Sequence, residues 1–289
     1  MRFLAKPVVS LLAAAIVSGS VWWASRGPDA MAIHPEVFGD TMEASGSLQV
    51  MTLNVAHGRG TRATQFLTTS SQHRASLDAV GDLLASRQAH VVALQEVDGP
   101  SLPTGRFDHL SHLAERSGHA HALRGTHVQL PGLGYGASML TSVPTQDAAS
   151  HTFGRTPPTP SKGFVIAEVE LDGRPLDVVS VHLDFARSSA REHQVSELVH
   201  ELRARDRPVV LMGDLNMGWE APAMQHLVEA LSLHTVEAEA PWVTFPSDGT
   251  RLDWILASRD LELHDVAVLD DVVSDHLAVV GTVRWAEAP

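Results

Sequence analysis

The chain contains no cysteine among its 289 residues. Disulfide bonds and thiolate metal sites are therefore excluded, and the fold must be stable without covalent cross-links. Basic residues are also scarce, with 21 Lys and Arg against 34 Asp and Glu. A protein that grips a long duplex through its phosphate backbone normally presents a basic surface, so nucleic acid is a disfavoured partner.

Long apolar runs are missing except at the N-terminus, where residues 7–24 carry no charge. They follow a short basic head that contains Arg2 and Lys6. This length is close to the minimum that spans a bilayer, so residues 1–24 are either a secretory signal or a single membrane anchor. Either way, the rest of the chain is expected to be exported.

Residues near the end of this segment favour two different outcomes, retention as a membrane anchor or cleavage as a secretory signal. Trp22 and Trp23 resemble an interfacial aromatic belt, which favours an anchor facing the periplasm or the extracellular side. Ser18 and Ser20 are small residues at the spacing of a cleavage site, which favours a secreted protein. We interpret the segment as an anchor through which residues 7–24 associate with a membrane.

The rest of the chain divides into a linker and one domain. Residues 25–47 lack clear periodicity and contain Gly27, Pro28 and Pro35, which is typical of a linker. Residues 48–286 alternate between strand and helix patterns, and a hydrophobic content of 44% supports a globular core. We expect this domain to be a monomer.

Apolar periodicity predicts the elements of this domain. A capping-box pattern, Ser189 and Glu192, starts the clearest helix. Short turns such as 171–175 imply hairpins and antiparallel pairing. The expected helices are 73–87, 107–116, 189–203 and 224–231, and the expected strands are 48–54, 91–96, 135–141, 164–171, 176–182, 208–212, 252–257, 261–268 and 278–284.

Polar side chains recur where these apolar strands end, and ends of different strands can converge on one rim of a sheet. Asp214 and Asn216 follow a buried strand and, by alternation, are expected to face the same way. A carboxylate that activates water, beside an amide that binds an oxyanion, suits phosphate ester hydrolysis. The other residues of this kind are Asn54, Glu96, His182, Asp253, Asp275 and His276.

Each of these residues also has an ordinary structural interpretation. Asn54 could be a turn residue, Glu96 a solvated acid, and His182 a hydrogen-bonded core histidine. Asp253 is harder to explain in that way, because burying an unpaired carboxylate within an apolar strand is costly. It is their joint occurrence at six strand ends that favours a site.

Six ordered motifs make the chain resemble the endonuclease/exonuclease/phosphatase superfamily of metal-dependent phosphoesterases. The resemblance covers about residues 48–285 and implies an α/β fold, a four-layer sandwich of two mostly antiparallel sheets flanked by helices. The motifs are Thr52-Leu-Asn-Val55, Leu94-Gln-Glu-Val97, Ser180-Val-His-Leu-Asp184, Gly213-Asp-Leu-Asn216, Arg251-Leu-Asp-Trp-Ile255 and Ser274-Asp-His276.

The resemblance also implies roles for the residues. Glu96, with Asn54 and Asp275, would bind Mg²⁺, with Mn²⁺ as an alternative. Five residues would be catalytic. Asp214 would activate the attacking water, and Asn216 would hold that water or a phosphoryl oxygen. His276 would contact the phosphate and be oriented by Asp253, and His182 would donate to another phosphate oxygen or to the leaving group.

Tyr135 and His57 are expected to line the pocket and bind substrate. The acidic domain and the export signal favour a phosphate ester of a phospholipid or small molecule outside the cytoplasm. Two alternatives stay open: a secreted DNase-like endonuclease, and a tethered binding module that has the fold without turnover.

Overall fold

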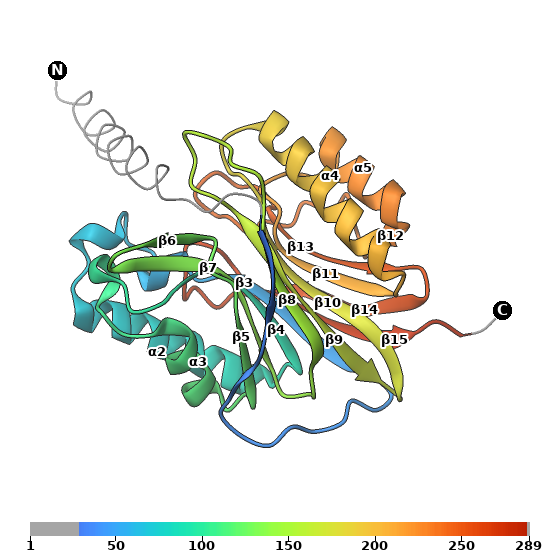
Figure 1. The fold of residues 1–289 in the computed structure, drawn as a ribbon, viewed down its shortest axis with the longest axis horizontal. Helices are drawn as coiled ribbons and strands as arrows, with labels where there is room; N and C mark the ends of the chain where they lie inside the picture. The colour runs from blue at the N-terminus through green and yellow to red at the C-terminus, as the bar shows by residue number, and fades with distance from the viewer. Residues whose placement is uncertain (1–28, 288–289) are drawn as a thin grey trace.

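A computed structural model describes residues 29–287 of the chain. Two β-sheets face each other, and helices cover the outer surface of each (Figure 1). The four-layer sandwich expected from the family resemblance is therefore confirmed.

The first sheet contains eight strands, seven of them on its main path. Their spatial order is β14 (Leu261–Val268), β15 (Val279–Trp285), β3 (Leu48–Asn54), β4 (Val91–Asp98), β7 (Leu133–Thr141), β5 (His121–Arg124) and β2 (Glu36–Val37), with β6 (Val128–Leu130) paired to β7. The second sheet has the order β1 (Asp29–Ile33), β8 (Gln146–Thr152), β9 (Gly163–Leu171), β10 (Arg174–His182), β11 (Val209–Asp214), β13 (Asp253–Ser258) and β12 (Leu233–His234).

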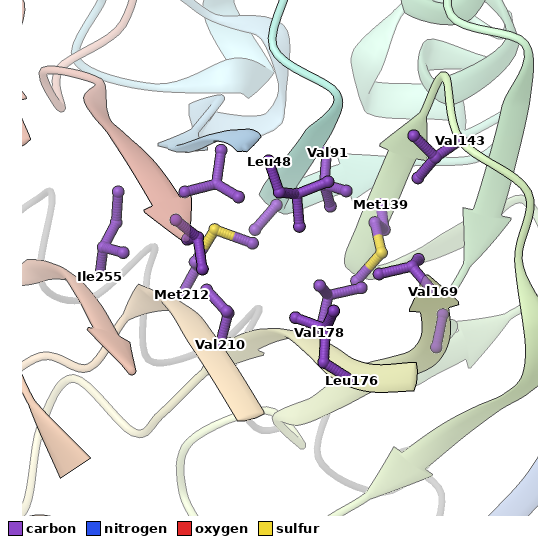
Figure 2. Packing of buried hydrophobic residues seen from close by; sticks show 14 of the residues in the cluster. Leu48, Val91, Met139, Val143, Val169, Leu176, Val178, Val210, Met212 and Ile255 are labelled. Atoms are coloured by element: carbon purple, nitrogen blue, oxygen red, sulfur yellow. The ribbon is translucent and has the colours of Figure 1, made fainter. Parts of the chain in front are cut away.

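Three apolar layers hold the sandwich together. The layer between the sheets joins Leu48, Val91 and Met139 of the first sheet to Val178 and Met212 of the second (Figure 2). Helices α2 (Ser70–Arg87) and α3 (His109–Ser117) pack on the first sheet, and α4 (Ser188–Arg205) and α5 (Pro222–Leu231) pack on the second. Because both faces of the central strands are covered, these strands read as continuous apolar runs rather than alternating ones.

Each sheet has one parallel pair among its described strands, β3 with β4 and β10 with β11. The helices α2 and α4 make the crossovers, as parallel neighbours require. Parallel strands end at the same edge of their sheet. A hydrogen bond from Asn54 at the end of β3 to Asp214 at the end of β11 shows that the two edges meet at one rim of the sandwich. The polar residues of the sequence motifs stand at this rim.

The expected linker 25–47 is not free of secondary structure. Strand β1 pairs antiparallel with β8 over five residues, and β2 pairs with β5. Ala44 is buried and bridges to Leu171. Two-residue and five-residue edge strands are too short to produce a readable period, which explains the wrong expectation for residues 29–47. The short strands β5, β6 and β12 were missed for the same reason. Strand β8 has seven residues but was also missed, because its only apolar residues are two alanines.

The capping box also lies elsewhere than expected. The cap of α4 is Arg187, which makes no side-chain cap bond, so the prediction for Ser189 and Glu192 was wrong. The turn before α4 is instead held by Asp184, whose Oδ1 accepts the backbone N–H groups of Ala186 and Arg187. A complete capping box starts α2, formed by Thr69 and Gln72.

Within residues 29–287, no helix is long and apolar enough to cross a membrane. The predicted anchor or signal at 7–24 lies outside the described residues.

Candidate active site

A cavity of about 520 Å³ opens at the rim where the four parallel strands end. It is lined from both sheets and from the loops that follow their strands. Seven residues expected at the site line it together: Asn54, Glu96, His182, Asp214, Asn216, Asp275 and His276.

Asp214 is the central group of the cavity. It ends β11, and in the strand register it stands between His182 of β10 and Asp253 of β13. Its Oδ2 accepts a hydrogen bond of 3.0 Å from Nδ2 of Asn54, which belongs to the other sheet. Burial raises the pKa of Asp214 to about 7, although His276 acts in the opposite direction. A carboxyl with a pKa near neutrality can both accept and release a proton under physiological conditions.

Asn216 lines the cavity for a different reason from the one expected. Strand β11 ends at Asp214, so strict alternation does not apply to the next two residues. The N–H of Asn216 instead donates to Oδ1 of Asp214 at 3.0 Å, which closes a tight turn with Asn216 at a positive φ of 51°. Asparagine adopts this left-handed conformation more readily than most residues.

His276 and Asp253 form a buried pair beside Asp214. Nδ1 of His276 lies 2.8 Å from Oδ2 of Asp253, and its Nε2 lies 3.8 Å from Oδ2 of Asp214. Burial lowers the pKa of His276, but the two carboxylates outweigh it and raise the pKa to about 10. His276 is therefore a cation at neutral pH. Asp253 stands behind it and does not line the cavity.

A β-bulge places Glu96 in the cavity. Leu94 and Val97 both pack toward α2 and α3, although three positions separate them, and the register with β7 shifts between them. One residue is therefore extra, and Glu96 has a φ of 56°. Burial raises the pKa of Glu96, but His57 and Lys162 overcome this and hold the pKa below its usual range. The strand was expected to stop at Glu96, yet it continues to Asp98.

His57 lies behind Glu96 rather than in the lining. Its Nε2 is 3.3 Å from Oε2 of Glu96, and its Nδ1 is 2.6 Å from Oδ1 of Asp98. Thr104 donates to the other oxygen of Asp98. Tyr135 packs edge-on against the His57 ring at 4.7 Å and is also outside the lining. His57 therefore supports Glu96 from behind, and Tyr135 packs against His57.

Lys162 is a site residue that sequence reasoning missed. It is 94% buried, and its Nζ lies 2.9 Å from Nε2 of His182. Burial lowers the pKa of Lys162, while Glu96 and Asp214 oppose this effect. Burial and the charge of Lys162 together lower the pKa of His182, so that imidazole is neutral. The chain contains only two lysines, and this rarity was the only available signal.

Asp275 is engaged by a cation from another loop. Its Oδ2 lies 2.6 Å from Nη2 of Arg59, and both residues line the cavity. The neighbouring Ser274 donates through its hydroxyl to the backbone oxygen of Asn54 at 2.7 Å. This bond ties the loop before β15 to the end of β3.

The donor set of the cavity fits a divalent cation that prefers oxygen. Glu96 is anionic and 20% exposed. The side-chain oxygen Oδ1 of Asn54 accepts from the N–H of Ala56 and keeps a second lone pair. A second arrangement joins Asp214, Asp253 and His276, whose ligand atoms all lie within 4.8 Å of one another. With His276 deprotonated, this buried triad could hold a metal ion.

Comparison with known proteins agrees with this geometry. The sequence model described as "Endonuclease/Exonuclease/phosphatase family" matches residues 51–276. A search of curated proteins finds no match to this chain.

Several solved structures are similar in fold. An endonuclease/exonuclease/phosphatase from Beutenbergia cavernae is 20% identical, with a TM-score of 0.69 over 84% of this chain and 72% of that one. The human Nocturnin catalytic domain with bound sulfate is 16% identical, with a TM-score of 0.63 over 90% and 98%. A Staphylococcus aureus beta toxin mutant with bound magnesium ions is 14% identical, with a TM-score of 0.58 over 81% and 99%.

At these identities the structural likeness concerns the fold alone, whereas the family model spans well over half of the sequence. The matched range also contains every residue placed around the cavity from Asn54 to His276. The chain therefore belongs to the endonuclease/exonuclease/phosphatase family.

Proposed function

We propose that this protein is a divalent-cation-dependent hydrolase of phosphate esters. The observation that carries the proposal is the contact around Asp214. The carboxyl group of Asp214, whose pKa is about 7, lies between the side-chain amide of Asn54 from the opposite sheet and the imidazolium of His276. All three groups line one cavity, so a base and a phosphate-binding cation face the same small volume.

In the proposed reaction, Asp214 takes a proton from a water molecule whose oxygen attacks phosphorus. The P–O bond to the leaving group breaks, and the leaving oxygen takes up a proton from solvent water, while Asp214 later returns its proton to solvent. The neutral imidazole of His182 is our candidate for a hydrogen-bond donor to a phosphate oxygen. His276 pairs with a non-bridging oxygen and stabilises its negative charge. Fixed donors of this kind typically contribute about 10²–10³ in rate.

Glu96, Asn54 and Asp275 would hold the cation, which we propose to be Mg²⁺, with Mn²⁺ as the alternative. When bound, such an ion neutralises phosphate charge and polarises the reacting oxygens. His57 and Asp98 would orient Glu96 for this task. Arg59 would have to share Asp275 with the ion, or release it.

The substrate we propose is a phospholipid head group or a small phosphodiester outside the cytoplasm. The net charge of −13 supports this choice over a long nucleic acid. The cavity is small, and Phe185, which is 60% exposed, adds an apolar edge to its rim. The apolar segment 7–24 supports export, as a membrane anchor or as a secretory signal.

An activity screen tests the proposal. The full chain is incubated with phosphatidylcholine, sphingomyelin, inositol phosphates, bis(p-nitrophenyl) phosphate, p-nitrophenyl phosphate and plasmid DNA, each with Mg²⁺ or with a chelator. We expect Mg²⁺-dependent release from lipid or small diesters, and loss of it in Asp214→Asn but not in the exposed control Asp260→Asn. Efficient plasmid nicking would favour the endonuclease, and equal background rates for wild type and Asp214→Asn would leave only a binding module.

A further inference from the structure

Three large apolar side chains project into solvent from two adjacent turns. Phe66 and Leu67 lie on η2 (Gln65–Leu67) and are 53% and 86% exposed. Leu102 begins η3 (Leu102–Thr104) and is 57% exposed. The two turns contact each other. Neither Phe66 nor either leucine belongs to a buried apolar cluster of the described chain, so their exposure is not explained by folding.

Buried groups hold both turns in place. Nε2 of His73 in α2 lies 3.3 Å from the backbone oxygen of Gln65, and Nε2 of His109 in α3 lies 3.0 Å from that of Thr104. The N–H of Leu102 donates to Gly132 at the start of β7. The apolar side chains are therefore presented by an ordered scaffold rather than by a loose loop.

The same region is basic in an acidic protein. Residues 55–77 contain Arg59, Arg62 and Arg74 but no Asp or Glu, and residues 99–107 contain only Arg106 as a charge. Arg62 bonds to the backbone oxygen of Arg59 and to the Ser76 hydroxyl. In residues 29–287, neither Arg62 nor Arg106 pairs with a carboxylate. Their charges are thus available to an external anion.

These turns lie at the cavity end of the sandwich. η3 follows the carboxyl end of β4, which carries Glu96, and η2 follows the carboxyl end of β3, which carries Asn54. Arg59, which lines the cavity, is joined to Arg62 by a hydrogen bond. A surface that engaged η2 and η3 would therefore lie beside the cavity mouth.

We propose that Arg62, Phe66, Leu67, Leu102 and Arg106, which we call the η2–η3 face, dock the domain on an anionic lipid surface. The apolar side chains enter the acyl boundary while the two guanidinium groups meet lipid phosphates, as interfacial segments do. Two of the three apolar groups are aliphatic leucines, which fit lipid chains and offer no ring for base stacking. This inference rests on the proposed function, because it delivers a membrane-borne phosphate ester to the cavity.

The absence of cysteine makes a site-specific test direct. In the full chain, Leu67→Cys carries the only thiol, and an environment-sensitive fluorophore attached there reports whether η2 enters the bilayer. The matched control is Val37→Cys, which is 70% exposed on β2. Val37 pairs with His121, and His121 with Thr141 at the far end of β7, so the control label lies at the opposite end of the sheet from the cavity. Both labelled proteins carry the same N-terminal segment, so membrane attachment through that segment alone cannot produce a difference between the two labels.

With vesicles of equal parts phosphatidylcholine and phosphatidylglycerol, we expect a blue shift and quenching by spin-labelled lipid at Leu67 and not at Val37. A second label at Leu102→Cys should behave like the first. The double substitution Arg62→Gln and Arg106→Gln should lower the partition coefficient onto these vesicles about 30-fold, since each basic residue near an anionic surface contributes about 1 kcal/mol. Added salt should have the same effect.

Three outcomes would overturn the proposal: a Leu67 label that stays in water on vesicles, equal shifts at Leu67 and Val37, or a shift with an oligonucleotide instead of lipid. Hydrolysis of bis(p-nitrophenyl) phosphate is measured on the same samples and should be unchanged by these variants. Retained hydrolysis without docking would reject the η2–η3 face alone. Docking without hydrolysis would reject only the proposed enzyme function.

Discussion

Nδ1 of His276 lies 2.8 Å from Oδ2 of Asp253, while its Nε2 faces Oδ2 of Asp214 at 3.8 Å. The imidazolium is thus held between a fully buried carboxylate and the carboxyl that ends β11. Removing the carboxylate of Asp253 should lower the pKa of His276, so that a smaller share of it is protonated, without changing the residues that line the cavity.

Asp253→Asn should lower kcat about 10²–10³-fold, the usual effect of losing one preorganised electrostatic group. The amide keeps the shape of the side chain but no longer favours a protonated His276. The check is steady-state hydrolysis of a soluble diester together with an NMR titration of the histidines. Asp260→Asn, on an exposed turn, is the control and should leave kcat unchanged. An unchanged titration of His276 would contradict the prediction.

The pH–rate profile of kcat/KM should be bell-shaped. Asp214 must be deprotonated to act as the base, so the rate falls as pH drops below its pKa of about 7. His276 must be protonated, so the rate falls again as pH rises through about 10. A bound cation favours the carboxylate form, so raising Mg²⁺ should move the acid limb to lower pH. The acid limb should vanish in Asp214→Asn, and its persistence there would assign the base elsewhere.

Lys162→Met should reduce kcat about 10–100-fold and move the acid limb to higher pH. The buried ammonium lowers the pKa of Asp214, so its removal makes that carboxyl harder to ionise. Lys162→Arg should retain most of the pH profile because the charge is kept. Arg155→Gln removes an exposed charge from the same loop and should change neither kcat nor the pH of the acid limb. A drop in kcat with an unmoved acid limb would indicate a purely structural role.

His57→Asn should weaken activation by Mg²⁺ about 10–100-fold, the range found for groups that orient a metal ligand. The substitution breaks the chain from Asp98 to Glu96, and asparagine tolerates the positive φ of 53° at this position. The measurement is rate against Mg²⁺ concentration, with calorimetric titration of Mg²⁺ as a second readout. His226→Asn on the exposed side of α5 is the control. If His57→Asn shows the Mg²⁺ dependence of the wild type, His57 does not orient Glu96 for metal binding.

Gly213→Ala should destabilise the fold by about 3 kcal/mol, combining backbone strain with a steric clash. Gly213 has a φ of 149°, and an added Cβ would collide with the backbone oxygen of Val181 in the neighbouring strand β10. Denaturant unfolding measures the loss. Gly218→Ala, where a Cβ meets open space, should change the free energy of unfolding by less than about 0.5 kcal/mol. Equal stabilities would show that β11 can shift away from β10.

The central strands, the main helices and the polar residues at the rim could all be predicted from the amino-acid sequence. Buried strands such as β4 and β11 need continuous apolar runs, and a polar residue at the end of such a run is visible without coordinates. The ordered motifs from Asn54 to His276 then sufficed to indicate the family and its sandwich.

Which side chains contact one another could not be predicted without the packed fold. The bulge at Glu96, the burial of Asp98 behind His57 and the contact of Lys162 with His182 depend on register and on loops that carry no period. The short edge strands β1 and β2 were likewise invisible, because their stability comes from partners more than 80 residues away. Periodicity reports which face a residue turns to the core, whereas the distance between two side chains depends on how separate elements pack.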